Sequence, residues 1–142
     1  MTKKKVFVSY DYSSDKHFKQ LLENWEEDPE FEFQFCIEPP LDINPENITH
    51  VKTELTARIH SASYTLVIVG KHANKDDRHA KLIGHKNWIN FEIFHSRQHQ
   101  NKIVAVKLDV NHELPDELLK AHVAWAPEFK KEHVIKALKA TM

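Results

Sequence analysis

The sequence contains only two glycines, Gly70 and Gly84, in 142 residues, and this scarcity excludes several nucleotide-binding motifs. Neither the G-x-G-x-x-G fingerprint of a Rossmann domain nor the G-x-x-x-x-G-K-[ST] sequence of a P-loop occurs, and both need glycines so that the backbone can approach phosphate groups. The G-x-S-x-G motif around a hydrolase nucleophile is missing as well. Dinucleotide binding in the Rossmann manner, P-loop chemistry and α/β-hydrolase chemistry are therefore disfavoured.

The sequence also has a single cysteine, no long apolar run and no excess of charge of one sign. The lone Cys36 cannot form an internal disulfide, which fits the cytoplasmic location that we expect. The longest apolar stretch, Thr65 to Gly70, is far too short to span a bilayer and no signal peptide precedes Val6, so we expect no membrane partner. A net charge of −1 gives no reason to expect nucleic acid as a partner.

The residues that are present are those of an ordinary globular protein. Hydrophobic residues make up 41% and charged residues 29% of the chain, with no internal repeat and no linker-like segment. A chain of this size buries roughly 68–70% of its unfolded surface, which is enough for a sizeable core. We therefore predict a single domain over residues 1–142.

Five segments have the pattern of β-strands. Three of them are short, rich in β-branched residues and apolar on both faces, as in a parallel sheet that helices cover on both sides. Another alternates strictly between apolar and polar residues, which suits an outer strand with one solvated face. In chain order the predicted strands are 5–10, 31–36, 64–70, 102–108 and a short one at 122–125.

Helical segments fall between these strands, with apolar residues spaced three and four apart after a capping residue. The predicted helices run from Ser14 or Asp15 to about Glu27, from Asn47 through Ile59, from near Asn87 to about Gln100, and from about Phe129 to the end, with a short one before the fifth strand. The alternation predicts an α/β fold of three layers: a flavodoxin-like, five-stranded parallel sheet of order 2-1-3-4-5 with helices on both faces.

Ligands of such a fold bind outside the carboxyl ends of the strands. That edge would gather the segments 10–14, 39–45, 70–86 and 109–113.

Two common functions of this fold lack their characteristic residues. A phospho-receiver would need an aspartate at the end of the third strand, where this sequence has Val69-Gly70. A flavodoxin would need a glycine-rich phosphate loop after the first strand, and residues 10–14 contain no glycine. Neither function is expected.

One predicted helix carries an unusual carboxylate. On a helical wheel Trp88, Glu92, His95 and His99 share a narrow stripe, flanked by Phe91 and Ile89. A glutamate within an aromatic and apolar stripe would be desolvated, and this raises a carboxyl pKa as in many catalytic acids and bases. The alternative is that Glu92 points to solvent or pairs with a lysine.

The same stripe raises the question of a metal site, because Glu92, His95 and His99 could face one ion. The sequence has no H-E-x-x-H motif and no Cys/His spacing typical of such a site, and histidines near a helix C-terminus are favourable on electrostatic grounds. We expect no bound metal. His72, His79 and His85 are interpreted as loop residues rather than ligands.

Four segments together resemble the compact bacterial and archaeal TIR-like family, including the TIR proteins of Thoeris antiphage defence. Val6-Phe-Val-Ser-Tyr10, with the acidic and hydroxyl-bearing loop to Asp15, is similar to the family's first box. Ser61 to Gly70 resembles its third-strand segment, and Ile103 to Leu108 its fourth strand. Trp88-Ile-Asn-Phe-Glu92 matches its W-x-x-x-E on the following helix. The match covers nearly the whole chain.

The resemblance implies an enzyme that cleaves NAD⁺ and makes a cyclic or otherwise modified ADP-ribose signal, which reaches a separate effector by diffusion. It makes Glu92 the catalytic residue that holds the ribose and stabilises positive charge. Trp88 would contact the ligand or support Glu92. Tyr10, Asp11 and Ser13 would line the pocket, and Pro40 to Asn44, including Ile43, would form the loop after the second strand.

The resemblance also implies self-association, and NAD⁺ would be a substrate with no bound cofactor. Two alternatives stay open, since one fold serves several functions. The first is a non-catalytic TIR-like module that signals by self-assembly, and the second is a nucleotide-binding protein of another chemistry. The loop from Lys71 to Lys86 is longer and more basic than the family pattern leads us to expect, which bears on how the pocket closes.

Overall fold

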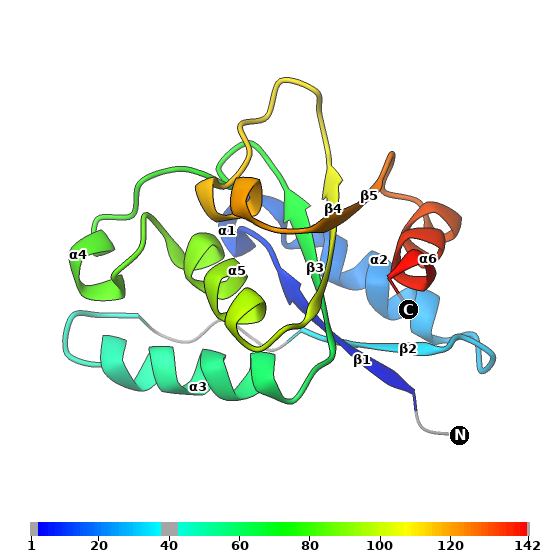
Figure 1. The fold of residues 1–142 in the computed structure, drawn as a ribbon, viewed down its shortest axis with the longest axis horizontal. Helices are drawn as coiled ribbons and strands as arrows, with labels where there is room; N and C mark the ends of the chain where they lie inside the picture. The colour runs from blue at the N-terminus through cyan, green and yellow to red at the C-terminus, as the bar shows by residue number, and fades with distance from the viewer. Residues whose placement is uncertain (1–2, 38–42, 142) are drawn as a thin grey trace.

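Strands and helices alternate along the chain in the computed structural model, which describes residues 3–37 and 43–141 (Figure 1). The five strands form one all-parallel sheet in the order β2-β1-β3-β4-β5, so the predicted flavodoxin-like order is confirmed. In chain order the elements are β1 (Lys4–Ser9), α1 (Tyr12–Asp15), α2 (His17–Glu26), β2 (Phe33–Cys36), α3 (Ile48–His60), β3 (Tyr64–Val69), α4 (Ala80–Ile83), α5 (Trp88–Gln98), β4 (Lys102–Lys107), η1 (Asp116–Lys120), β5 (Val123–Ala126) and α6 (Lys131–Ala140).

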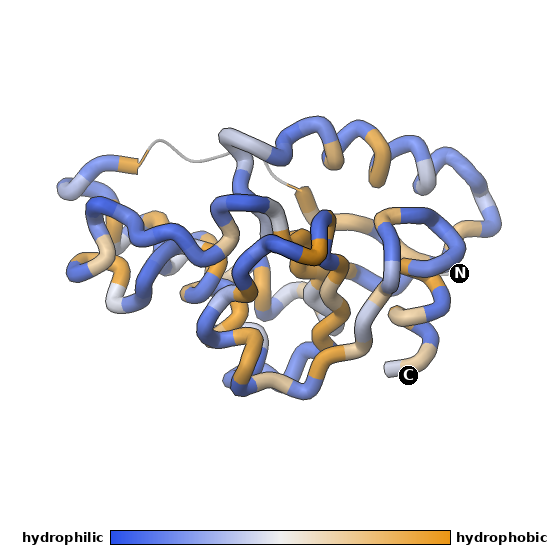
Figure 2. The backbone as a smooth tube through the Cα atoms, turned by 90° about the horizontal axis from the view of Figure 1, so that it is seen from above, coloured by the Kyte–Doolittle hydropathy of each residue, from blue (hydrophilic) through white to orange (hydrophobic). Residues whose placement is uncertain are grey.

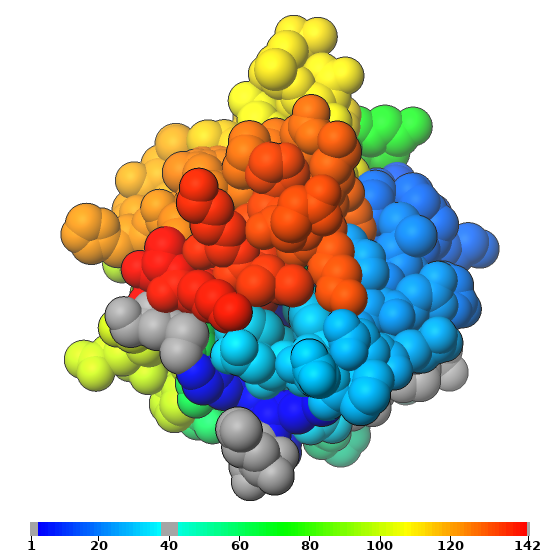
Figure 3. Space-filling model, turned by 90° about the vertical axis from the view of Figure 1, so that its right-hand side faces the viewer, coloured from blue at the N-terminus to red at the C-terminus, as the bar shows by residue number. Residues whose placement is uncertain are grey.

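The central strands are apolar on both sides because helices cover both faces of the sheet, as predicted. On one face Val6, Val8 and their neighbours pack against Leu22 of α2 and Val134 of α6. Helices α2 and α6 meet there through Phe129, and Figure 3 shows α6 in red beside the blue and cyan segment of α2 and β2. This face holds the larger core.

On the other face α3, α5 and η1 cover the sheet, and their contacts with it form two smaller apolar clusters. Ile89 and Ile93 of α5 pack against Val67 and Val69 of β3, while Phe7 of β1 packs against α3. Figure 2 shows the hydrophobic stretches gathered in the middle of the molecule and hydrophilic ones around it. Because α5 crosses above the end of β1, this face brings the predicted catalytic helix to the ligand edge of the sheet.

The single helix predicted from Ser14 or Asp15 to about Glu27 is divided in two: α1 begins earlier, at Tyr12, and α2 begins at His17, after Lys16 and without a side-chain cap. The expectation that Ser14 or Asp15 caps the first helix is wrong, because the Asp11 side chain accepts a hydrogen bond from the Ser13 N–H and starts α1 at Tyr12. Aspartate is among the best N-cap residues, since its carboxylate satisfies a backbone donor that the first turn leaves free. The remaining predicted helices agree with α3, α5, η1 and α6 within about two residues.

The long loop after β3 contains a short helix that was not predicted. Helix α4 ends at Gly84, whose φ of 83° is the left-handed conformation that favours glycine at a helix end. Within the part of the chain that the structure describes, no helix is long and apolar enough to cross a membrane.

Candidate functional site

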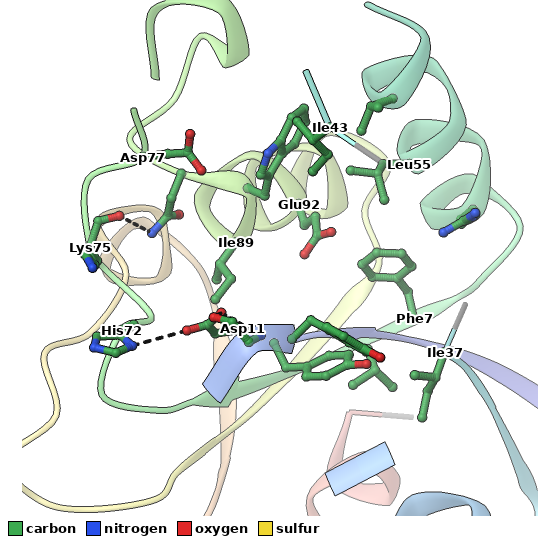
Figure 4. Close-up of a pocket in the computed structure, with 18 of the residues that line it drawn as sticks. Phe7, Asp11, Ile37, Ile43, Leu55, His72, Lys75, Asp77, Ile89 and Glu92 are labelled. Atoms are coloured by element: carbon green, nitrogen blue, oxygen red, sulfur yellow. Dashed lines mark hydrogen bonds and ion pairs between the residues drawn. The ribbon is translucent and has the colours of Figure 1, made fainter. Parts of the chain in front are cut away.

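A pocket of about 670 Å³ opens at the carboxyl ends of β1 and β2, between helices α3 and α5 and the loop after β3 (Figure 4). The size is typical of pockets for small organic ligands, which run from roughly 300 to 1,000 Å³. The pocket is lined by all six residues that the sequence and the family resemblance single out: Tyr10, Asp11, Ser13, Ile43, Trp88 and Glu92. The structure thus brings them together from β1, α1, α5 and the segment before α3.

Glu92 is held at the floor of this pocket by the start of α5 and by a hydrogen bond from β1. The Asn87 side chain accepts a hydrogen bond from the Asn90 N–H, which starts the helix at Trp88 and places Glu92 one turn later. The Oγ of Ser9, at the end of β1, donates to Oε1 of Glu92 across 2.6 Å, and Glu92 is only 9% exposed. Its carboxyl therefore faces neither bulk solvent nor a lysine.

The surroundings of Glu92 are apolar. Figure 4 shows its carboxyl group between the ring of Phe7 and the side chain of Ile89, with Leu55 of α3 opposite. Burial raises the pKa of Glu92 to about 8, although the Ser9 hydrogen bond and the nearby charge of Arg58 both act to lower this pKa. Near neutral pH the group is therefore mostly protonated. A carboxyl group in a pocket whose pKa is strongly shifted is a candidate for a functional site, because catalytic acids and bases need such shifts.

Trp88 lies one turn before Glu92 and is half-buried in the pocket wall. Its ring meets the edge of Phe91, with centroids 5.4 Å apart at an interplanar angle of 75°. This contact leaves part of the indole surface in the pocket. Trp88 thus has both a packing role against Phe91 and a surface on which a planar ligand could stack.

Asp11, Ser13 and His72 form a cluster at the rim. Asp11 accepts from the hydroxyl of Ser13 at 2.8 Å and lies 3.4 Å from Nδ1 of His72 (Figure 4). The same ring nitrogen of His72 is 2.8 Å from the Ser14 hydroxyl. Asp11 and Ser13 therefore have a local structural role, since they fold the turn after β1. The cluster joins this turn to the loop after β3.

Tyr10 belongs to both the core and the pocket. Its ring packs against the larger core, yet its buried hydroxyl has no hydrogen-bond partner among the described residues. Burial, together with the charges of Tyr12 and Glu92, raises the pKa of Tyr10 to about 12. The hydroxyl therefore stays protonated and can donate a hydrogen bond.

The loop after β3 forms one wall of the pocket with Lys75, Asp76, Asp77 and Arg78. The Nδ2 of Asn87 donates to the carbonyl oxygens of Ala73 and Lys75 at 2.9 and 3.0 Å. The Nδ2 of Asn90 donates to Oδ1 of Asn74 at 3.1 Å. These buried amides seat the loop on α5, so its extra length builds a wall instead of leaving the pocket open.

The segment after β2 is only partly described. Ile43 lines the pocket and is 36% exposed, while the predicted loop from Pro40 to Asp42 lies outside the described residues. The volume of 670 Å³ is thus the volume of the pocket formed by the described residues.

The helical stripe of Glu92, His95 and His99 does not converge on one point. His95 lies in a separate hollow beside Lys52 and Phe91, and His99 stacks on His60 with ring centroids 4.2 Å apart. Over residues 3–37 and 43–141, no group of three or more His, Cys, Asp or Glu side chains is placed to hold a metal ion.

Sequence reasoning did not single out Arg58 and His72, which line the pocket, or Ser9, which holds Glu92 by a hydrogen bond. Ser9 is the last residue of β1, where a side chain at the carboxyl end of a strand faces the ligand edge. Arg58 follows Leu55 by three residues on α3, so the helical spacing that singled out Glu92 could also have shown a charge beside an apolar stripe. His72 had no comparable signal, because its position depends on how the loop folds.

Comparison with known proteins gives one family. No curated protein matches the chain. The family model described as "Thoeris protein ThsB, TIR-like domain" matches residues 7–113, which run from β1 past β4 and include Trp88 and Glu92. Membership of this family indicates a role in antiphage defence signalling. Since the model covers well over half of its length, the chain belongs to the Thoeris ThsB TIR-like family.

Proposed function

We propose that this protein cleaves NAD⁺ between nicotinamide and ribose and releases an ADP-ribose-derived signal in antiphage defence. The observation that carries the proposal is the position of Glu92, a buried carboxyl at the floor of a nucleotide-sized pocket, beside Trp88. Family membership supports the same reading, since Trp88 to Glu92 lies within the matched region.

The chemistry needs a group that stabilises positive charge on ribose. The C1′–N bond breaks, its electron pair leaves with neutral nicotinamide, and the ribose becomes an oxocarbenium-like cation. An ionised Glu92 stabilises that cation and accepts hydrogen bonds from ribose hydroxyls. Burial gives Glu92 a pKa of about 8, and the positive nicotinamide ring favours its ionised form. Substrate binding and proton release from Glu92 are thus coupled.

A nucleophile then completes the reaction at C1′. Water gives linear ADP-ribose and a proton, whereas an atom of the same ADP-ribose gives a cyclic product. Trp88 offers an aromatic surface on which the nicotinamide ring can stack. No metal or flavin takes part in these steps, and the product reaches a separate effector by diffusion.

The test is nicotinamide release from NAD⁺, followed by chromatography, for the wild type and for Glu92→Gln. Glu117→Gln is the matched control, because Glu117 is also 9% exposed but lies on η1, paired with Arg97 at 2.8 Å and away from the pocket. We expect release by the wild type and by Glu117→Gln, and none by Glu92→Gln. Assays are repeated with extract of phage-infected cells as a source of activator. If the wild type is inert in both conditions, the protein is a non-catalytic, self-assembling module.

A further inference from the structure

Arg58 is a largely desolvated cation in the pocket that the cleavage step above does not use. It projects from α3 into the pocket lining, and its side chain is 19% exposed. Lys75 and Arg78, the other cations of the lining, lie on the surface loop and are exposed. Removing a charge from water costs free energy unless another group compensates. Arg58 therefore needs an anionic partner more than the other two cations do.

Among the described residues, Arg58 has only one weak anionic partner. The Nε of Arg58 lies 3.6 Å from a carboxylate oxygen of Glu54, one turn earlier on the same helix, and Glu54 is 45% exposed. Such exposed pairs contribute little. Within residues 3–37 and 43–141 the guanidinium donates no hydrogen bond, although it carries five N–H donors. Most of its donor capacity is thus available to a ligand.

The position of Arg58 relative to Glu92 indicates which part of a ligand it meets. The two residues face the same pocket from α3 and α5, close enough that the charge of Arg58 acts on the Glu92 carboxyl. A ribose held at Glu92 by its C1′ side carries its 5′-phosphate a few bonds away. Arginine binds phosphate through two parallel N–H bonds better than any other side chain.

We propose that Arg58 binds the 5′-phosphate of the ribose held at Glu92, and that the pocket thereby selects nucleotides over nucleosides. This inference rests on the proposed function, because it takes Glu92 as the reacting end of the pocket. The inference also fixes the orientation of the substrate. Its nicotinamide half lies between α3 and α5, and its adenosine half extends toward the opening of the pocket.

Three substrates test the inference: NAD⁺, nicotinamide mononucleotide, which keeps that phosphate, and nicotinamide riboside, which lacks it. For Arg58→Ala we expect kcat/KM to fall about 10- to 100-fold on the first two, mostly through KM, since a hydrogen bond to a charged group is worth about 1.5–3 kcal/mol. On the riboside the same variant should match the wild type within about threefold. Arg58→Lys should recover part of the loss, because lysine keeps the charge without the second donor.

Two other roles of Arg58 would give different results. If Arg58 only stabilises α3 through Glu54, Glu54→Ala should reproduce the loss, which overturns the inference. If Arg58 acts only through the ionisation of Glu92 and does not contact the phosphate, activity should fall equally on all three substrates, which also overturns the inference. Thermal melts of each variant show whether the fold is intact.

Binding of ADP-ribose, measured by calorimetry, separates this inference from the proposed function. If the wild type cleaves no NAD⁺ but binds ADP-ribose more tightly than Arg58→Ala does, the phosphate site stands and the proposed activity fails. If Arg58→Ala binds ADP-ribose as tightly as the wild type, the phosphate site is overturned even when the enzyme is active. A wild type that neither cleaves NAD⁺ nor binds ADP-ribose overturns both.

Discussion

The hydroxyl of Ser9 donates a hydrogen bond to Oε1 of Glu92 across 2.6 Å, and it joins the end of β1 to the middle of α5. Both residues are buried, and 83 positions separate them in the chain. The two sequence segments that most resemble TIR-like domains, around Ser9 and around Glu92, are thus linked by a direct contact. The ionisation of Glu92 depends on the geometry of the first strand as well as on burial.

Activity should rise with pH. The carboxylate form of Glu92 is the one that stabilises a cation, and burial raises the pKa of this group to about 8. Since kcat/KM reports the free enzyme, its profile for NAD⁺ cleavage should climb to a plateau with a midpoint near that value. Initial rates of nicotinamide release at low NAD⁺ measure it. A profile that falls with rising pH would show that Glu92 acts as a proton donor.

Ser9→Ala should move that midpoint upward. The Ser9 hydrogen bond favours the charged form of Glu92, so its loss should raise the pKa of Glu92 further. Ser96→Ala is the matched control. Ser96 is a buried serine on α5, the helix of Glu92, but its hydroxyl lies 2.7 Å from that of Thr65 and does not bind Glu92. The control should leave the midpoint in place. Equal profiles for Ser9→Ala and the wild type would show that the Ser9 hydrogen bond does not lower the pKa of Glu92.

Glu92→Gln should stabilise the protein, and more so at higher pH. The pKa of Glu92 is about 8 in the folded chain against an ordinary value of 4.5, so between these pH values the folded state binds a proton that the unfolded state has lost. The free energy of unfolding of the wild type therefore falls as pH rises through this window, by at most about 5 kcal/mol from this group.

The measurement is urea unfolding of the wild type and Glu92→Gln at several pH values. Their difference isolates Glu92, because the other groups are common to both. Glu117→Gln should instead destabilise the protein, since it breaks the ion pairs of Glu117 with Arg97 and Lys120. A difference between the wild type and Glu92→Gln that stays constant with pH would contradict the raised pKa.

Trp88→Ala should weaken substrate binding with a small effect on stability. The exposed part of the Trp88 ring faces the pocket, and aromatic stacking contributes about 0.5–1.5 kcal/mol, so KM for NAD⁺ should rise about 2- to 12-fold. Trp88→Phe should retain most of the affinity. Trp125→Ala is the control, because Trp125 is 46% exposed on β5 and does not line the pocket. An unchanged KM for Trp88→Ala would leave this residue a packing role only.

Gly70→Ala should destabilise the fold through Asp15. A Cβ at Gly70 would lie 2.1 Å from Oδ2 of Asp15, a carboxyl that is 6% exposed and has little room to move. Overpacking of this kind costs about 1–3 kcal/mol. Adding Asp15→Ala should recover most of the loss, as a double-mutant cycle in urea unfolding would show. Gly84→Ala should give no such recovery, since its cost comes from the positive φ of Gly84.

The architecture could be predicted because burial leaves a direct mark on the sequence. Strands β1, β3 and β4 are apolar on both faces, and this pattern indicates a parallel sheet whose order then follows from the handedness of its crossovers. Helix starts were less certain where several capping residues are adjacent. Asp11, Ser14 and Asp15 all qualify, and only the fold shows that the Asp11 carboxylate takes the role.

The site was predictable where its residues share one element and not where it depends on contacts between elements. Trp88 and Glu92 lie on one helix, so a helical wheel found them together. Arg58 reaches the pocket and Ser9 reaches Glu92 because α3 and β1 meet α5 at particular angles, which no local pattern specifies. The wall after β3 was hidden for a related reason, since its asparagines indicate a polar loop but not their partners.

The amides that seat this wall on α5 do not ionise. Asn87 donates to two main-chain carbonyls, and Asn90 donates to the side-chain amide of Asn74. Protons can therefore be added to or removed from Glu92 while these supports keep the same charge and the same bonds. The three amide hydrogen bonds between the wall and α5 are thus independent of pH over the range in which Glu92 titrates, so loss of the Glu92 proton does not by itself release the wall from α5.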